Sequence, residues 1–223
     1  MNKAYFTPEL FQFLKQLKRN NRRDWFQANK QRYETAVQQP CLRFIMDAGF
    51  RLREISPWIV ADPRPSGGSL FRIYRDVRFS ADKSPYKTHT GMYFPHGGAG
   101  KDVHTPGFYF HLEPGNCFVA AGSWHADTRS VAKIRDAIAW QQEAWKKARR
   151  GLVLEGDSLT RPPRGYSPDH PFVEDLKRKD FVASVELSEA QVCRPRFMAD
   201  FGEACRELAP LVEFLSKVLG LRF

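Results

Sequence analysis

The chain has 223 residues, of which 42% are hydrophobic and 27% are charged, and this balance is typical of a folded globular protein. No stretch approaches the roughly 20 consecutive apolar residues of a membrane-spanning helix, and the N-terminal segment lacks the apolar core of a secretory signal. We therefore expect a cytoplasmic protein without a membrane partner. Its four cysteines are expected to be reduced, because none has the spacing of a metal or redox pair.

The formal net charge is +10, with 35 lysines and arginines against 25 acidic residues. An excess of this kind suits a nucleic acid, an anionic surface or an acidic small molecule as partner. The basic residues are spread widely and lack the interleaved aromatic and glycine pattern of an RNA-recognition strand. We therefore treat nucleic acid as the weaker alternative, and the sequence does not predict an oligomeric state.

Helices are predicted at both ends of the chain. Thr7 is a good N-cap and Pro8 suits the first turn, so the first helix is expected over residues 7–20. Apolar stripes with helical spacing predict further helices at residues 22–38, 40–55, 128–149, 172–178, 195–208 and 210–219. Pro40 and Pro210 are expected to interrupt the helical segments at the points where they occur.

Strands are predicted in four segments, at residues 88–94, 107–113, 116–124 and 181–187. Pro114-Gly115 suits the centre of a type II turn, so the second and third strands form a hairpin in which His111 faces Phe118. Side chains alternate between the faces of a sheet. One face of this hairpin is therefore apolar, with Phe108, Phe110, Leu112, Cys117, Val119 and Ala121. The other face is mixed, with Tyr109, His111, Glu113, Phe118, Ala120, Gly122 and Trp124.

These elements predict a single α+β domain, in which an antiparallel sheet carries N- and C-terminal helices packed on its apolar face. On the mixed face, Ala120 and Gly122 are small residues side by side. They leave room for a packed helix, for the loop at residues 75–87, or for a ligand.

The densest cluster of basic and aromatic residues lies at residues 71–94. Arginine offers a rigid fork that matches phosphate or carboxylate, and lysine adds a point charge. We predict that an anionic small molecule is bound by Arg72, Arg75, Arg78, Lys83, Lys87 and His89, together with Tyr109 and Trp124 of the mixed face. In the alternative interpretation, the basic side chains point into solvent or pair with Asp76 and Asp82, and the run is an internal structural clamp.

His111 and Glu113 lie on the same face of one predicted strand. A carboxylate beside an imidazole orients it and raises its pKa, which suits general acid–base catalysis. We predict these two residues as the catalytic pair if the site performs chemistry; otherwise they hold the basic loop on the sheet. A metal site that adds His89, which is also on a predicted strand, is a further alternative, but the third ligand is not fixed by the sequence, and we predict no metal.

Common local signatures of enzyme families do not occur in the chain. It has no Walker A loop, no G-x-G-x-x-G, no G-x-S-x-G and no H-E-x-x-H. The His-x-Glu of residues 111–113 also opens the zinc deaminase signature, but the P-C-x-x-C that must follow is missing. The sequence therefore predicts no particular cofactor and does not decide whether the protein is an enzyme.

Several motifs together resemble a known family. They are Asn-Arg-Arg-Asp-Trp-Phe at 21–26, Tyr-Arg-Asp-Val-Arg-Phe-Ser at 74–80, Gly-Phe-Tyr-Phe-His-Leu-Glu-Pro at 107–114, and Ala-Gly-Ser-Trp at 121–124. In these motifs the chain resembles the bacterial and fungal family catalogued as domain of unknown function 2461. The resemblance spans nearly the whole chain and implies one domain. It implies no activity and transfers no catalytic residue.

Overall fold

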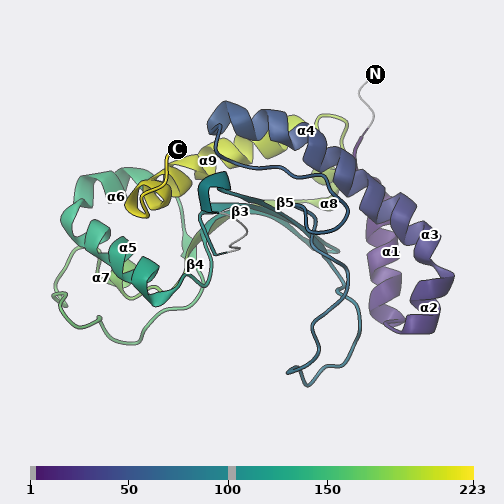
Figure 1. Ribbon diagram of the computed structural model, residues 1–223, viewed down its shortest axis with the longest axis horizontal. Coiled ribbons are helices and arrows are strands. Elements are labelled where there is room, and N and C mark those ends of the chain that lie inside the picture. The colour runs from purple at the N-terminus through teal and green to yellow at the C-terminus, as the bar shows by residue number, and fades with distance from the viewer. Residues whose placement is uncertain (1–3, 100–103) are drawn as a thin grey trace.

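The computed structural model describes residues 4–99 and 104–223 (Figure 1). Its centre is a five-stranded antiparallel sheet with the strand order β1-β2-β3-β5-β4. The strands are β1 (Thr90–Pro95), β2 (Gly107–Glu113), β3 (Asn116–Ser123), β4 (Leu154–Glu155) and β5 (Phe181–Leu187). The predicted α+β class is confirmed, as are the four predicted strands. The two-residue strand β4 was not predicted, because it is too short to show alternation.

The register predicted for the central hairpin is correct. His111 pairs with Phe118 and Tyr109 pairs with Ala120 across β2 and β3. The predicted apolar face is the core face, and its side chains are all buried: Phe108, Phe110, Leu112, Cys117, Val119 and Ala121.

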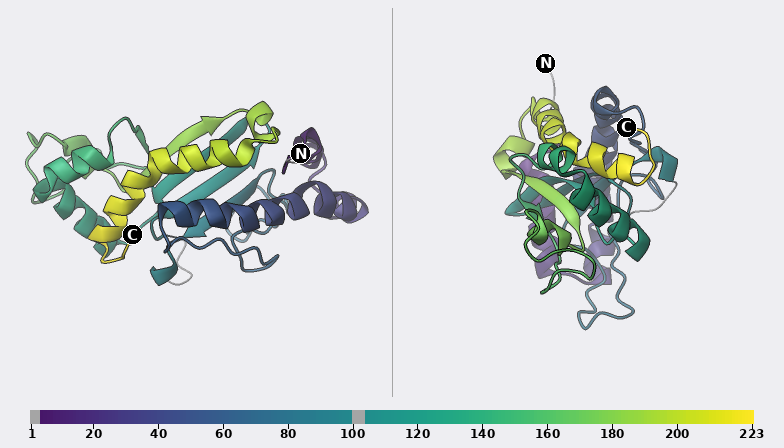
Figure 2. Two further views of the ribbon diagram at one scale, coloured as in Figure 1. Left: turned by 90° about the horizontal axis from the view of Figure 1, so that it is seen from above. Right: turned by 90° about the vertical axis from the view of Figure 1, so that its left-hand side faces the viewer.

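Helices α4 (Gln39–Ile55) and α9 (Phe197–Val218) cover the core face of the sheet (Figure 2). An aromatic cluster joins the two helices to β2. The ring of Phe44 lies 5.3 Å from that of Phe110 and 5.0 Å from that of Phe201. Because α4 comes from the N-terminal part of the chain and α9 from its end, both termini contribute to one core.

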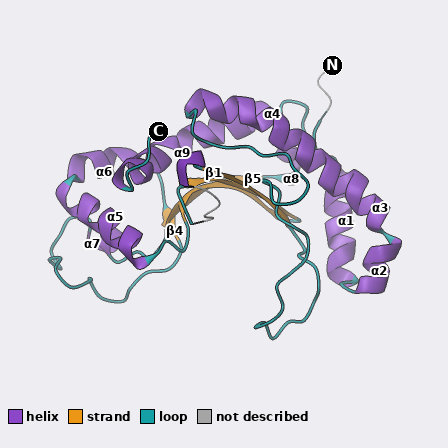
Figure 3. Cartoon of the chain, in the orientation of Figure 1, coloured by secondary structure: helices purple, strands orange, loops and turns teal. Residues whose placement is uncertain are grey.

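Two smaller groups of helices flank the ends of the sheet (Figure 3). At one end lie α1 (Pro8–Arg19), α2 (Arg23–Ala28) and α3 (Lys30–Tyr33). At the other end lie α5 (Thr128–Trp140), α6 (Gln142–Ala148) and α7 (Val173–Leu176). A π-helical turn (Glu34–Gln38), a 3-10 turn (Gly97–Ala99) and α8 (Glu189–Val192) complete the described elements.

Several helix boundaries differ from the prediction. The helix predicted at residues 22–38 is divided into α2, α3 and the π-helical turn. Pro40 does not end a helix: α4 continues directly from the π-helical turn, and Pro40 lies just after it. Pro210 lies inside α9, which continues through it. Its exposed position leaves the freed carbonyl group of the preceding turn to solvent, so one helix replaces the predicted pair. The single helix predicted at residues 128–149 divides at Gln141, whose φ of −115° and ψ of 50° are not helical.

Residues 69–87 extend the sheet beyond β1, a feature that the sequence did not predict. The N–H of Phe71 donates to the carbonyl oxygen of Gly91 at 2.9 Å, so this segment runs alongside β1. The chain then turns back in a hairpin, in which Tyr74 is bridged to Tyr86. We call residues 74–86 the basic hairpin; its tip projects away from the sheet (Figure 1).

The base of the basic hairpin is fastened to the N-terminal helices. The Asn21 side chain donates to the carbonyl oxygen of Tyr86 at 2.9 Å and accepts from its N–H at 3.1 Å. The Tyr86 ring stacks on Phe26, with centroids 4.1 Å apart. The turn between α1 and α2 therefore fixes the position of the residues that follow the hairpin.

Within the described ranges, no helix combines the length and the hydropathy needed to cross a bilayer.

We expect Asn21→Ala to destabilise the fold by about 1–3 kcal/mol, because it leaves both backbone polar groups of Tyr86 without their partner. The neighbouring Asn20 makes one local bond, from its amide to the Gln16 carbonyl oxygen. Asn20→Ala is therefore the matched control and should change stability by less than about 0.5 kcal/mol. Urea denaturation of both variants measures the difference. Equal losses would show that Asn21 does not fasten the hairpin.

Candidate functional site

The sheet is arched, and the face opposite α4 and α9 is concave (Figure 3). In the described part of the chain, no helix crosses this face (Figure 1). Alternation places Tyr109, His111 and Glu113 of β2 there. Ala120 of β3 and Ser184 of β5, which face each other, are only half-buried. The concave face is thus a surface with polar groups at one side and accessible small residues beside them.

His111 is the centre of the polar cluster. Its ring stacks on Phe118, with centroids 4.7 Å apart and an interplanar angle of 10°. Its Nδ1 lies 2.9 Å from the hydroxyl oxygen of Tyr109, and its Nε2 lies 3.5 Å from Oε2 of Glu113. The imidazole is therefore held on its face and at both nitrogens, which fixes its orientation.

Tyr109 reaches His111 because the neighbouring strand provides space. Gly91 of β1 pairs directly with His111, and a Cβ at Gly91 would overlap the Tyr109 hydroxyl and approach its ring to 2.7 Å. Phe71 lies on the other side of the Tyr109 ring, with centroids 5.9 Å apart. The glycine and the phenylalanine together hold the tyrosine against the sheet.

The segment that follows the basic hairpin adds His89 and Lys87 to the cluster. The centroid of the His89 ring lies 4.7 Å from that of His111. Nζ of Lys87 lies 5.4 Å from the centroid of Phe71, within the range of a cation–π contact. Both side chains are half-buried. The structure therefore brings together Lys87, His89, Tyr109, His111 and Glu113 from two distant parts of the sequence.

Burial sets the charge state of this cluster. It lowers the pKa of His89 from its ordinary value of 6.5 to about 4, with smaller contributions from His111, Lys87 and Arg75 in the same direction and from Glu113 in the other. Burial also lowers the pKa of His111, against the opposing effect of Glu113. Burial raises the pKa of Tyr109. At neutral pH the cluster thus holds two neutral imidazoles and a protonated phenol.

Burial also changes the pKa of Lys87. Burial lowers the pKa of its ammonium group, and the nearby Arg72 lowers it further. Among the described residues, neither Lys87 nor Arg72 has a carboxylate within ion-pair distance. Lys87 therefore lacks a direct counter-charge, whereas the exposed Arg72 lies near enough to Asp76 to help lower the pKa of that carboxyl.

The remaining basic side chains are engaged within the basic hairpin. Arg75 forms an ion pair with Asp82, Arg78 is 2.7 Å from Asp76, and Nζ of Lys83 donates to the Val77 carbonyl oxygen at 3.0 Å. Arg78 holds the pKa of the Asp76 carboxyl at about 2. Arg75 also acts on the pKa of His89, so it lies near the cluster, whereas Arg78 and Lys83 stabilise the tip of the hairpin.

Trp124 is not brought to the cluster. The last pair of β2 and β3 at its end of the strand is Gly107 with Gly122, whereas His111 pairs with Phe118. Trp124 lies beyond that last pair, half-exposed, with its ring 4.8 Å from that of His125. A ligand at His111 would have to extend along the whole hairpin to reach it.

His89, His111 and Glu113 each offer a ligand atom, and these atoms all lie within 4.8 Å of one another. From the sequence, this trio is only an alternative, because no local pattern shows the pairing of β1 with β2 that aligns the two segments. The roles of Phe71, Gly91 and Asn21 were not predicted, because each depends on a contact between segments that are separated in the sequence.

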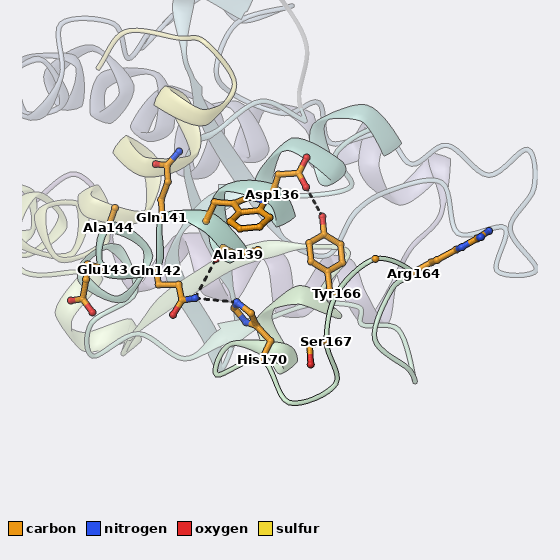
Figure 4. Close-up of a pocket in the computed structure, with 12 residues that line it drawn as sticks. Asp136, Ala139, Gln141, Gln142, Glu143, Ala144, Arg164, Tyr166, Ser167 and His170 are labelled. Atoms are coloured by element: carbon orange, nitrogen blue, oxygen red, sulfur yellow. Dashed lines mark hydrogen bonds between the residues drawn. The ribbon is translucent and has the colours of Figure 1, made fainter.

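A separate cavity of about 810 Å³ lies between α5, α6 and residues 164–170 (Figure 4). Tyr166 donates to Asp136 at 2.8 Å, and the Gln142 amide lies 3.4 Å from His170. Its polar groups are mostly exposed and already hydrogen-bonded to one another. We therefore place the candidate site at the concave face, where titratable groups are buried together.

A family model described as a conserved hypothetical protein (DUF2461) matches residues 9–214. This range contains Asn21, the basic hairpin and all of β1, β2 and β3. The comparison with curated proteins and the comparison with solved structures gave no match.

We expect His89 to titrate near pH 4, well below an exposed histidine, because burial opposes its charged form. NMR titration of the histidine ring protons, with a chelator present, measures this pKa. The unfolded chain takes up this proton near pH 6.5, so the free energy of unfolding should fall as the pH falls from about 6.5 to about 4. The fall should be smaller in His89→Gln. A His89 pKa near 6.5 would show that the cluster is open to water.

Proposed function

Because the chain belongs to the family of conserved hypothetical proteins DUF2461, whose description specifies no chemistry, we propose a function from the concave face alone: it binds a small anionic molecule that carries phosphate or carboxylate. The observation that carries this proposal is Lys87, which lies half-buried near His89, with no described carboxylate within ion-pair distance and with Arg72 as a second positive charge nearby. The ligand would lie between Lys87 and the half-buried Ala120, with the rings of Phe71 and Phe118 as walls.

Burial favours binding of an anion at Lys87. The half-buried ammonium has lost part of its hydration and has no carboxylate beside it, so its charged form is disfavoured and its pKa is lowered. A bound phosphate or carboxylate would supply the missing charge and stabilise the charged form. Arg72 is exposed at the rim and adds a donor fork. Electrostatics therefore makes the proposed site selective for anions.

Proton transfer at the same place would belong to His111 and Glu113. His111 is neutral at neutral pH and is fixed by Tyr109, so it can accept a proton from a bound ligand. The Glu113 carboxylate, 3.5 Å from its Nε2, would stabilise the imidazolium that forms. We include acid–base catalysis in the proposal on this arrangement.

We expect orthophosphate, nucleotides, sugar phosphates or dicarboxylates to stabilise the protein against thermal unfolding. At about 100 times its Kd, a ligand of the folded state adds about 2.7 kcal/mol. Lys87→Gln and Arg72→Gln should abolish most of this response. Arg78→Gln is the matched control, because it removes the same charge from the hairpin tip, where Arg78 pairs with Asp76. A response that survives in Lys87→Gln, or that Arg78→Gln also removes, would contradict the proposed site.

The salt dependence of binding distinguishes a nucleic-acid partner from a small anion. Binding to duplex DNA weakens with the logarithm of salt concentration by about 0.9 per phosphate contacted. A small ligand held by Lys87 and Arg72 meets only these two charges and should show a shallow dependence. A steep dependence, equally affected by Arg78→Gln and Lys87→Gln, would favour the general basic surface.

A further inference from the structure

We propose that His89, His111 and Glu113 bind a divalent transition-metal ion, with Zn²⁺ as the best match. The inference concerns the same face as the proposed anion site, and its geometry does not depend on anion binding. A metal on Nε2 of His111 would replace the proton-accepting role proposed for this residue, because Nδ1 would then carry a hydrogen. His89 follows the basic hairpin, whereas the other two residues belong to β2. The fold therefore brings together two imidazoles and one carboxylate from separate segments.

The distances suit a metal better than they suit a hydrogen bond. Nε2 of His111 and Oε2 of Glu113 are 3.5 Å apart, which is long for hydrogen-bonded atoms. Two ligands that are each about 2.1 Å from a tetrahedral ion are about 3.4 Å from each other. The ligand atoms of all three residues lie within 4.8 Å, so rotations of the side chains close the set.

The burial of the three residues suits a metal as well. His111 is buried and His89 is half-buried, so neither imidazole is freely exposed to solvent. Glu113 would bring one negative charge to a half-buried position beside them. Without a cation, that charge would repel an anion bound near His111. With a divalent cation bound, the net charge at this place becomes positive and attracts an anion.

Tyr109 supplies the outer contact that a metal-bound histidine requires. Since Nε2 of His111 faces Glu113, this nitrogen would bind the metal. Nδ1 would then carry the hydrogen and donate it to the Tyr109 hydroxyl oxygen, 2.9 Å away. Such partners fix the tautomer and the ring orientation of the ligand. Because Gly91 leaves space for the tyrosine, the neighbouring strand also supports the site.

The ligand set selects the class of ion. Two nitrogens and one oxygen suit Zn²⁺, Fe²⁺ or Co²⁺, whereas Mg²⁺ and Ca²⁺ prefer oxygen ligands alone. With three coordinating side chains, at least one coordination position of the metal stays open for water or for an oxygen of a bound anion, as in zinc enzymes. Lys87 lies near His89, so an anion could be held by the metal and by this side chain.

Metal binding is tested on the full chain without a histidine tag, stripped with a chelator and titrated with Zn²⁺ against a chromophoric competitor. We expect one ion per chain and no competition from Mg²⁺. Tyr109→Phe should weaken binding by about 10 to 100-fold, the usual cost of losing an outer partner. His89→Ala and Glu113→Gln should weaken it more. Co²⁺ should give ligand-field bands that His89→Ala removes.

His170→Ala is the matched control, because His170 borders the separate cavity and should leave the affinity unchanged. Circular dichroism of the metal-free variants checks that they fold. Glu113→Gln keeps the size of the side chain, so it tests the ligand even if a histidine variant is unstable. Absence of Zn²⁺ binding by the wild-type chain would overturn the inference. So would undiminished affinity in folded Glu113→Gln or a loss in His170→Ala equal to that in His89→Ala.

Adding phosphate to the same samples separates this inference from the proposed function. Zn²⁺ binding without any effect of phosphate on thermal stability would support the metal site and contradict the anion site. A phosphate response that Lys87→Gln removes, in a protein that does not bind Zn²⁺, would do the reverse.

Discussion

The candidate site depends on the missing side chain at Gly91. This residue pairs with His111 across β1 and β2, and any Cβ would collide with the Tyr109 ring. With the space free, Tyr109 lies across the strand and its hydroxyl reaches the imidazole of His111. A larger residue would displace the tyrosine, and His111 would lose the contact that fixes its tautomer and direction. The absence of a side chain at one position of β1 thus determines how His111 is held on β2.

A second constraint is the attachment of the basic hairpin. Its tip is stabilised by its own ion pairs, whereas its base is held by Asn21 and by the stacking of Tyr86 on Phe26. This division explains why a run of basic residues does not act as one unit. Charges at the tip are balanced locally, and Lys87 and His89, which follow the base, are delivered to the sheet.

The sequence predicted what local patterns encode. Alternation in β2 and β3 and the turn at Pro114-Gly115 were sufficient for the register and the core face. Strand β4 has two residues and no pattern, and an exposed Pro210 was tolerated because the core contacts of α9 outweigh one lost hydrogen bond. The approach of His89 to His111 depends on the pairing of β1 with β2, which no local signal reports. The sequence therefore predicted that the basic run and the polar strand face lie together, but not which basic side chains reach His111.

We propose that two segments converge on the concave face into one site for a cation and an anion, where His89 and His111 lie beside the Glu113 carboxylate and near Lys87. The most direct measurement is a crystal structure of the protein with Zn²⁺ and phosphate, using anomalous diffraction at the zinc edge. We expect one peak bonded to His89, His111 and Glu113, with phosphate between the metal and Lys87. A peak elsewhere, or a Lys87 side chain turned away from bound phosphate, would contradict it.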